Sequence, residues 1–165
     1  MTSRSVSVVD LAAVKKLPVD FLRNQELKDT PAGVCISYFR LDGSPAARHR
    51  LRTALAAKDG SSWTPGEGTI EPYGLWRLRS SHRELHIVEG ESDCWALWFH
   101  AFPALGIPGA TMAKVLTTEH VADVERLVIH QEPDAAGKQF VTAVLARLAD
   151  IGWHGAARIL TRPGG

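Results

Sequence analysis

The second half of the chain alternates short hydrophobic segments with helix-like segments, and this alternation constrains the fold more than any other feature. Hydrophobic segments of strand length lie at 85–88, 104–107, 127–130 and 156–160. Between them, helical spacing of apolar residues predicts helices over 91–102, 118–124 and 135–151. Strands that alternate with helices are typical of βαβ units, whose right-handed crossovers build a parallel sheet. The pattern predicts an α/β domain over residues 81–165, with a parallel sheet flanked by helices.

The first half has a different pattern. Residues 8–27 predict two short helices separated at Pro18, and residues 33–39 and 47–52 predict two strands joined by a turn at Asp42-Gly43. A segment rich in Gly, Ser and Pro over 58–72 predicts an exposed loop. We therefore expect a small α+β subdomain over residues 1–80, with the boundary near residue 80.

Composition excludes several classes of protein. Of the 165 residues, 45% are hydrophobic, which is enough for a packed core and argues against disorder. The sequence has no apolar stretch long enough to cross a membrane and no signal-peptide pattern, so we expect a cytoplasmic protein without a membrane partner. The two cysteines, Cys35 and Cys94, lie far apart, which argues against a zinc ribbon or a disulfide framework.

Charge is distributed unevenly although the net charge is only +1. Residues 1–83 contain 13 Lys or Arg against 8 Asp or Glu, whereas residues 84–165 contain 6 against 10. A basic half next to an acidic half suits a polyanion on one side and a metal ion on the other, although ordinary scatter of surface charge gives the same imbalance.

Acidic residues follow two of the predicted strands. Glu89 ends the strand at 85–88, Asp93 follows it, and Glu132 and Asp134 come just after the strand at 127–130. Ligands of open α/β sheets bind beyond the carboxyl ends of the strands, and carboxylates are ligands that Mg²⁺ prefers. The motifs predict a site for Mg²⁺ or Mn²⁺. Each acid also has a purely structural interpretation, because Asp134 suits a helix N-cap and Asp93 a first helical turn.

These motifs resemble those of the TOPRIM domain, found in bacterial-type primases, topoisomerases and some nucleases. The resemblance rests on Glu89-Gly90-x-x-Asp93 and on an acid-x-Asp pair ahead of Ala135-Ala136-Gly137. The intervening segment, 102–110, is similar to the phage and plasmid primase branch of that family. The region before residue 80, including Tyr73-Gly74-Leu75, resembles the region that precedes TOPRIM in the same branch.

The resemblance implies roles for the acids and a function for the chain. Glu89 would be the general acid/base or a metal ligand, with Asp93 in support, and Glu132 and Asp134 would bind the metal. Glu132 stands where the family has Asp, a difference that keeps the carboxylate but changes its reach. The implied function is a primase-type nucleotidyltransferase that makes RNA primers from nucleoside triphosphates on single-stranded DNA in a phage, plasmid or other mobile element, with a replicative helicase as partner.

Two alternatives remain open from the sequence. One is a non-catalytic module that binds nucleic acid and recruits other proteins, and the other is a TOPRIM nuclease. Primases of this type continue beyond the last strand with further acidic residues, whereas this sequence ends at Gly165. We therefore expect a fragment of a longer protein, or a domain that works with a partner.

Basic and aromatic residues suggest where nucleic acid would bind. Alternate arginines at 48, 50 and 52 would share one face of a strand and contact successive phosphates, unless that face is merely solvated. The predicted nucleic-acid or nucleotide ligands are Arg40, Arg48, Arg50, Arg52, Lys114 and Lys138. Trp63 is the candidate for stacking on a base, whereas the spacing of Trp95, Trp98 and Phe99 predicts core packing.

Overall fold

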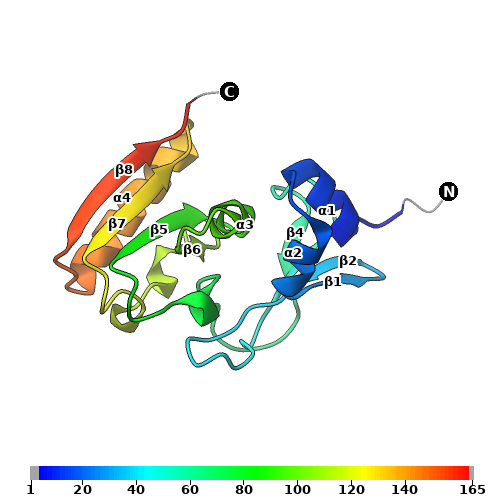
Figure 1. Cartoon of the computed structure of the whole chain (residues 1–165), viewed down its shortest axis with the longest axis horizontal. Coiled ribbons are helices and arrows are strands. Elements are labelled where there is room, and N and C mark those ends of the chain that lie inside the picture. Colours follow the sequence, from blue (N-terminus) through cyan, green and yellow to red (C-terminus); the bar gives the residue numbers. More distant parts are fainter. Residues whose placement is uncertain (1–3, 164–165) are drawn as a thin grey trace. The chain divides into compact units, whose positions relative to one another are not determined.

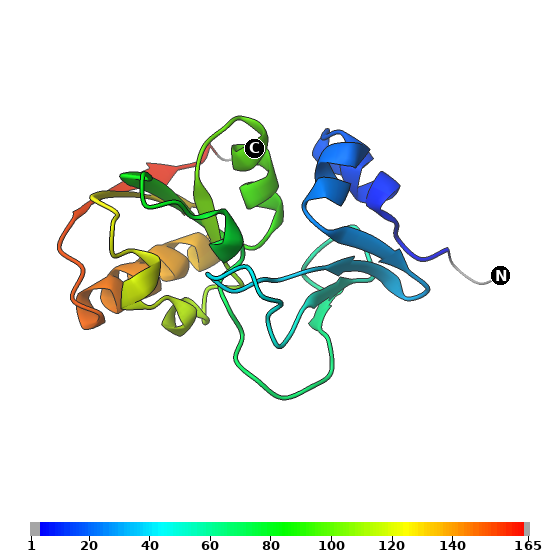
Figure 2. The same cartoon turned by 60° about the horizontal axis from the view of Figure 1, so that its bottom comes forward.

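The computed structural model describes residues 4–163, which divide into two compact units (Figures 1 and 2). Apart from Leu41–Gly43, which group with the second unit, the chain up to Ile70 forms the first and the chain from Glu71 onward the second. The boundary between the two units thus comes earlier in the sequence than the boundary that we predicted near residue 80. Residues 71–80 group with the second unit because Tyr73 pairs with Gly106 through two backbone hydrogen bonds and Leu75 is buried in the core.

The first unit packs two short helices with a four-stranded antiparallel sheet. A capping box starts the first helix, where Ser7 accepts from the backbone of Asp10 and the Asp10 carboxylate accepts from the backbone of Ser7. Pro18 separates the helices, as predicted. The elements are α1 (Val8–Lys15), α2 (Val19–Asn24), β1 (Leu27–Thr30), β2 (Gly33–Ile36), β3 (Arg50–Arg52) and β4 (Ser61–Trp63), with sheet order β1-β2-β3-β4.

Two strands of this sheet were not predicted. β1 begins at Leu27, where we expected a helix to end, and β4 lies inside the segment 58–72 that we expected to be a loop. Both strands are only three or four residues long, too short to show an alternating pattern. Their strand character comes from hydrogen bonding to β2 and β3 rather than from their own composition.

The second unit is built on a four-stranded parallel sheet, which confirms the predicted fold class (Figure 1). All three pairings are parallel, so the carboxyl ends of the strands meet at one edge. The strands are β5 (Glu84–Glu89), β6 (Ala104–Ile107), β7 (Arg126–Gln131) and β8 (Ala156–Thr161), in the order β6-β5-β7-β8.

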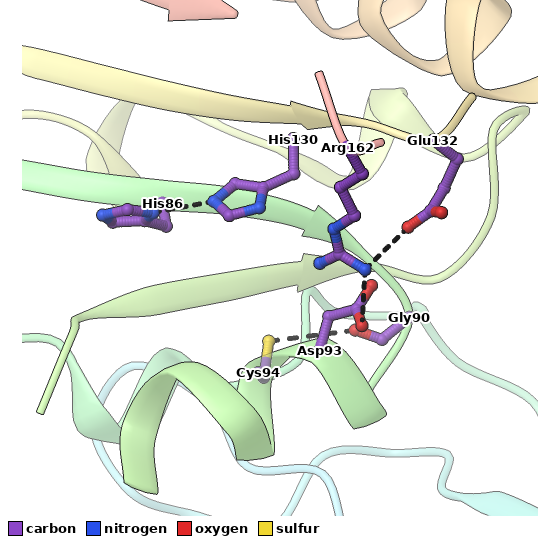
Figure 3. A network of polar contacts seen from close by, with 7 residues as sticks. All are labelled: His86, Gly90, Asp93, Cys94, His130, Glu132 and Arg162. Carbon is purple, nitrogen blue, oxygen red and sulfur yellow. Dashed lines mark hydrogen bonds and ion pairs between the residues drawn. The ribbon is translucent and has the colours of Figure 1, made fainter. Parts of the chain in front are cut away.

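Helices α3 (Ser92–Phe99) and α4 (Ala135–Asp150) lie on opposite faces of this sheet (Figure 3). Alternate strand residues such as Ile87 and Ile129 pack with α4 in the main core, together with Phe140 and Val144. On the other face, Trp95 and Trp98 of α3 are buried, as predicted.

Three expectations about helices were wrong. The segment 118–124 contains only a single 3₁₀ turn, Thr118–His120, and α3 ends at Phe99 rather than at 102. Phe99 is 45% exposed, although we expected it in the core. These segments have apolar residues at helical spacing, but Pro103 begins the next connection soon after α3, which limits the length of that helix. Among the described residues, no helix is both long and apolar enough to cross a membrane.

Candidate functional site

Four carboxylates gather at the carboxyl edge of the parallel sheet. Glu89 is the last residue of β5, and Asp93 lies in the first turn of α3. Glu132 and Asp134 follow β7 and precede α4. The structure therefore brings together the four acids that the sequence singled out. We call Glu89, Asp93, Glu132 and Asp134 the acidic site.

Three of these acids lie close enough to Glu89 to influence its ionisation. Partial burial is the largest cause that raises the pKa of Glu89, and repulsion from Asp134, Glu132 and Asp93 raises it further. A hydrogen bond from the backbone of Ala110 opposes the shift. The acidic site thus accumulates negative charge that a cation would relieve.

The backbone of Glu132 lies directly against the first turn of α4. Asp134 is the N-cap of α4, and its carboxylate accepts a hydrogen bond of 2.7 Å from the backbone N–H of Gly137. A Cβ atom on Gly137 would lie only 2.1 Å from the carbonyl oxygen of Glu132. The sequence Glu132-Pro133-Asp134-Ala135-Ala136-Gly137 therefore needs glycine at its last position, and both interpretations of Asp134, cap and site residue, are compatible.

Arg162 enters the acidic site from the far end of β8, and sequence reasoning did not identify it. Its Nη1 atom lies 2.8 Å from the Glu132 carboxylate and 3.1 Å from that of Asp93 (Figure 3). Its backbone N–H donates to the carbonyl of Gln131, at 3.0 Å, which extends the pairing of β8 with β7. No local motif marks this arginine, because only the strand order places it beside two acids from other parts of the chain.

Two buried histidines lie on the α3 face of the sheet, next to the acidic site. Nδ1 of His86 and Nε2 of His130 are 2.8 Å apart, on the neighbouring strands β5 and β7 (Figure 3). Burial, with the adjacent His86 and Arg162, lowers the pKa of His130 to about 4, while Asp93 acts in the opposite direction. His130 is therefore neutral at neutral pH.

The donor set suits a hard divalent cation, because carboxylate oxygens are the ligands that Mg²⁺ and Mn²⁺ prefer. The arrangement seen here is not yet a coordination shell. Within residues 4–163, no three His, Cys, Asp or Glu side chains converge closely enough to hold a metal ion. Two of the four acids are instead paired with Arg162. Metal binding by Glu89, Glu132 and Asp134 thus requires side chains to turn.

The predicted basic residues differ in their surroundings. The prediction that Arg52 contacts a phosphate is wrong, because this side chain is only 1% exposed. Its guanidinium donates to the carbonyls of Ala54 and Leu55 and so stabilises a loop. The guanidinium carbon of Arg50 lies 4.6 Å from the centre of the Trp63 ring. Trp63 is therefore half-buried beneath an arginine, not an open stacking platform.

The other predicted basic residues lie nearer the surface. Arg48 is half-buried and donates to the carbonyl of Thr64, at 3.2 Å. Arg40 is exposed in the first unit. In the second unit, Lys114 and Lys138 are exposed, and Lys138 lies one turn after Asp134 on α4.

Several solved structures share this fold. A DNA primase domain from Pseudomonas aeruginosa matches with a TM-score of 0.67 and 20% identity, over 82% of this chain and 45% of that one. A DnaG primase catalytic domain bound to ssDNA matches with a TM-score of 0.76 and 13% identity, over 95% and 66%. An E. coli primase catalytic core matches with a TM-score of 0.61 and 16% identity, over 88% and 52%.

The chain spans about half to two thirds of the length of these three structures. At such identities the likeness concerns the fold, which is that of a primase catalytic core with its TOPRIM sheet. No protein-family model matches the sequence, and no curated protein matches it either. The resemblance to a primase-type TOPRIM fold is thus confirmed, whereas the phage or plasmid branch stays a prediction.

Proposed function

We propose that the chain is the core of a metal-dependent primase-type nucleotidyltransferase, which joins nucleoside triphosphates into RNA primers on single-stranded DNA. The observation that carries this proposal is the meeting of Glu89, Asp93, Glu132 and Asp134 at the carboxyl edge of the parallel sheet. Burial and the charges of the other three acids raise the pKa of Glu89, so the site has the donors and the unbalanced charge that a divalent cation needs.

Within this proposal each acid has its own task. Glu132 and Asp134, with Glu89, would hold Mg²⁺ or Mn²⁺. A bound cation would neutralise phosphate charge and lower the pKa of the attacking 3′-hydroxyl. A carboxylate oxygen of Glu89 that is not bound to the cation would accept the proton of that hydroxyl. Asp93 supports it from the first turn of α3.

The basic residues contribute binding rather than chemistry. Exposed or half-buried cations suit the phosphates of the template and of the triphosphates, namely Arg40, Arg48, Arg50, Lys114 and Lys138. A replicative helicase is the proposed partner, and a phage, plasmid or other mobile element the proposed setting. These roles follow from the family resemblance and from the fold shared with primase cores.

A second function, a non-catalytic recruiting module, is favoured by one observation. Arg162 already pairs with Asp93 and Glu132, which leaves fewer free carboxylates for a metal. In such a module the arginine would be a permanent counter-ion and the acidic site would serve only to hold the sheet edge together.

Metal binding distinguishes the two functions. We expect electron paramagnetic resonance to detect Mn²⁺ bound to the wild type, and Asp134→Asn to lose at least ten-fold in affinity. Asparagine is as good an N-cap as aspartate, so this change removes the charge while keeping α4 capped. Asp123→Asn is the matched control, because Asp123 is exposed and precedes β7, at the opposite end of that strand.

Turnover then separates the chemistries. With single-stranded DNA, nucleoside triphosphates and Mn²⁺, we expect the wild type to make short RNA products, and Asp134→Asn to make none while still binding DNA. Degradation of the DNA instead of synthesis would identify a nuclease. Absence of Mn²⁺ binding, with DNA and nucleotide present, would favour the recruiting module.

A further inference from the structure

Arg162 has a fixed backbone and a side chain directed into the acidic site. A backbone hydrogen bond to Gln131 holds its main chain beside the end of β7. A single guanidinium nitrogen, Nη1, contacts both Glu132 and Asp93 (Figure 3). Only 32% of the side chain is exposed. One positive charge therefore lies between two carboxylates that come from separate parts of the sheet edge.

A buried ring nitrogen of His130, beside Arg162, lacks a hydrogen-bond partner among the described residues. His130 is 7% exposed, and its Nε2 atom is paired with His86. Its other nitrogen, Nδ1, is buried and has no hydrogen-bond partner among the described residues. Figure 3 shows this nitrogen on the side of the ring that faces Arg162. A buried polar atom without a partner is unfavourable, so its position beside Arg162 points to a ligand or water that belongs in the acidic site.

We propose that Arg162 is an internal cation that a divalent metal ion displaces, so that the acidic site alternates between an arginine-bound and a metal-bound state. This inference rests on the proposed function and adds regulation to the same site. Mg²⁺ needs carboxylate oxygens at about 2.0–2.1 Å in octahedral geometry. The Arg162 guanidinium contacts one of the proposed ligands, Glu132, and the neighbouring Asp93, so it takes up part of that space and repels a second positive charge at close range.

The arrangement of the acids supports the exchange. Without displacement of Arg162, no three potential ligands converge within the described part of the chain. Asp93 and Glu132 are the two acids that Arg162 neutralises, whereas Glu89 and Asp134 remain without that cation. Release of the arginine would return both carboxylates to the site. The Arg162 side chain is 32% exposed and follows the end of the edge strand β8, so it borders the solvent into which it would turn.

The test compares Mn²⁺ affinity, measured by electron paramagnetic resonance, among arginine variants of the full chain. We expect Arg162→Gln to bind Mn²⁺ at least ten-fold more tightly than the wild type, because the competing charge is gone. Arg162→Lys keeps the charge and should stay close to the wild type. Arg158→Gln is the matched control, since it removes the same charge from an exposed position on β8 and should change the affinity less than two-fold.

A measurement on the wild type avoids any folding defect of the variants. The NMR signal of the Arg162 Nε–H group should shift as Mg²⁺ is added, with the same midpoint as Mg²⁺ binding. Equal or weaker Mn²⁺ binding by Arg162→Gln, or an Arg162 signal that stays unchanged while Mg²⁺ saturates, would overturn the exchange and leave the metal site intact. Failure of both the wild type and Arg162→Gln to bind Mn²⁺ would overturn the metal site and the exchange together.

Discussion

Replacing His130 with glutamine should make the protein less sensitive to acid. His130 is buried next to His86 and near Arg162, and its pKa is lowered from 6.5 to about 4. Because the pKa is lower in the folded state, the unfolded chain takes up the proton first as the pH falls. The contribution of His130 to stability is therefore full above about pH 6.5 and is lost as the pH falls towards 4.

The expected magnitude follows from this shift. Between about pH 7.5 and about pH 5, proton uptake by the unfolded chain at this one position removes about 2 kcal/mol from the free energy of unfolding. His130→Gln lacks the titrating ring, so its free energy of unfolding should fall by about 2 kcal/mol less than that of the wild type over the same interval. Urea unfolding followed by tryptophan fluorescence, without metal, measures both values.

His100→Gln is the control, because His100 is exposed and its loss should leave the acid sensitivity of the wild type unchanged. The reasoning would be refuted by equal acid sensitivity in His130→Gln and the wild type. An NMR titration that places the pKa of His130 near 6.5 would refute it as well.

Three further changes test the packing and electrostatics of the second unit. Gly137→Ala should lower the free energy of unfolding by about 2 kcal/mol in urea unfolding, against the usual gain from alanine in a helix, because its Cβ would meet the Glu132 carbonyl. Trp95→Phe should lower the free energy of unfolding by about 2–3 kcal/mol in the same assay, because the buried Tyr73 hydroxyl loses the 2.8 Å hydrogen bond from Trp95 Nε1. An unchanged free energy of unfolding would contradict this reasoning. Without metal at neutral pH, Glu89→Gln should raise the melting temperature, because the raised pKa of Glu89 shows that its charged form is disfavoured in the fold. This gain in melting temperature should vanish as the pH falls below the usual pKa range of a glutamate side chain, because Glu89 is then neutral in both the folded and the unfolded state. A gain that persists at that pH would contradict the assignment to the charge of Glu89.

The strands and helices of the second unit were predictable where the local pattern was strong. The four hydrophobic segments became β5 to β8, and the amphipathic spacing around Phe140 and Val144 became α4, because burial of one face is visible in the sequence. The short strands β1 and β4 were missed, since three or four residues show no period. The expected helix at 118–124 shrank to a turn because its apolar residues fit the core without a regular helix.

The sequence by itself determined which acids would meet. Glu89 ends one strand, and Glu132 and Asp134 follow another, so any parallel sheet that joins those strands brings their carboxyl ends to one edge. Only the tertiary structure decided what accompanies them. The order β6-β5-β7-β8 sets β8 beside β7, which delivers Arg162 to acids far away in the sequence and sets His130 beside His86. Such contacts depend on strand order and register, which no local pattern of residues specifies.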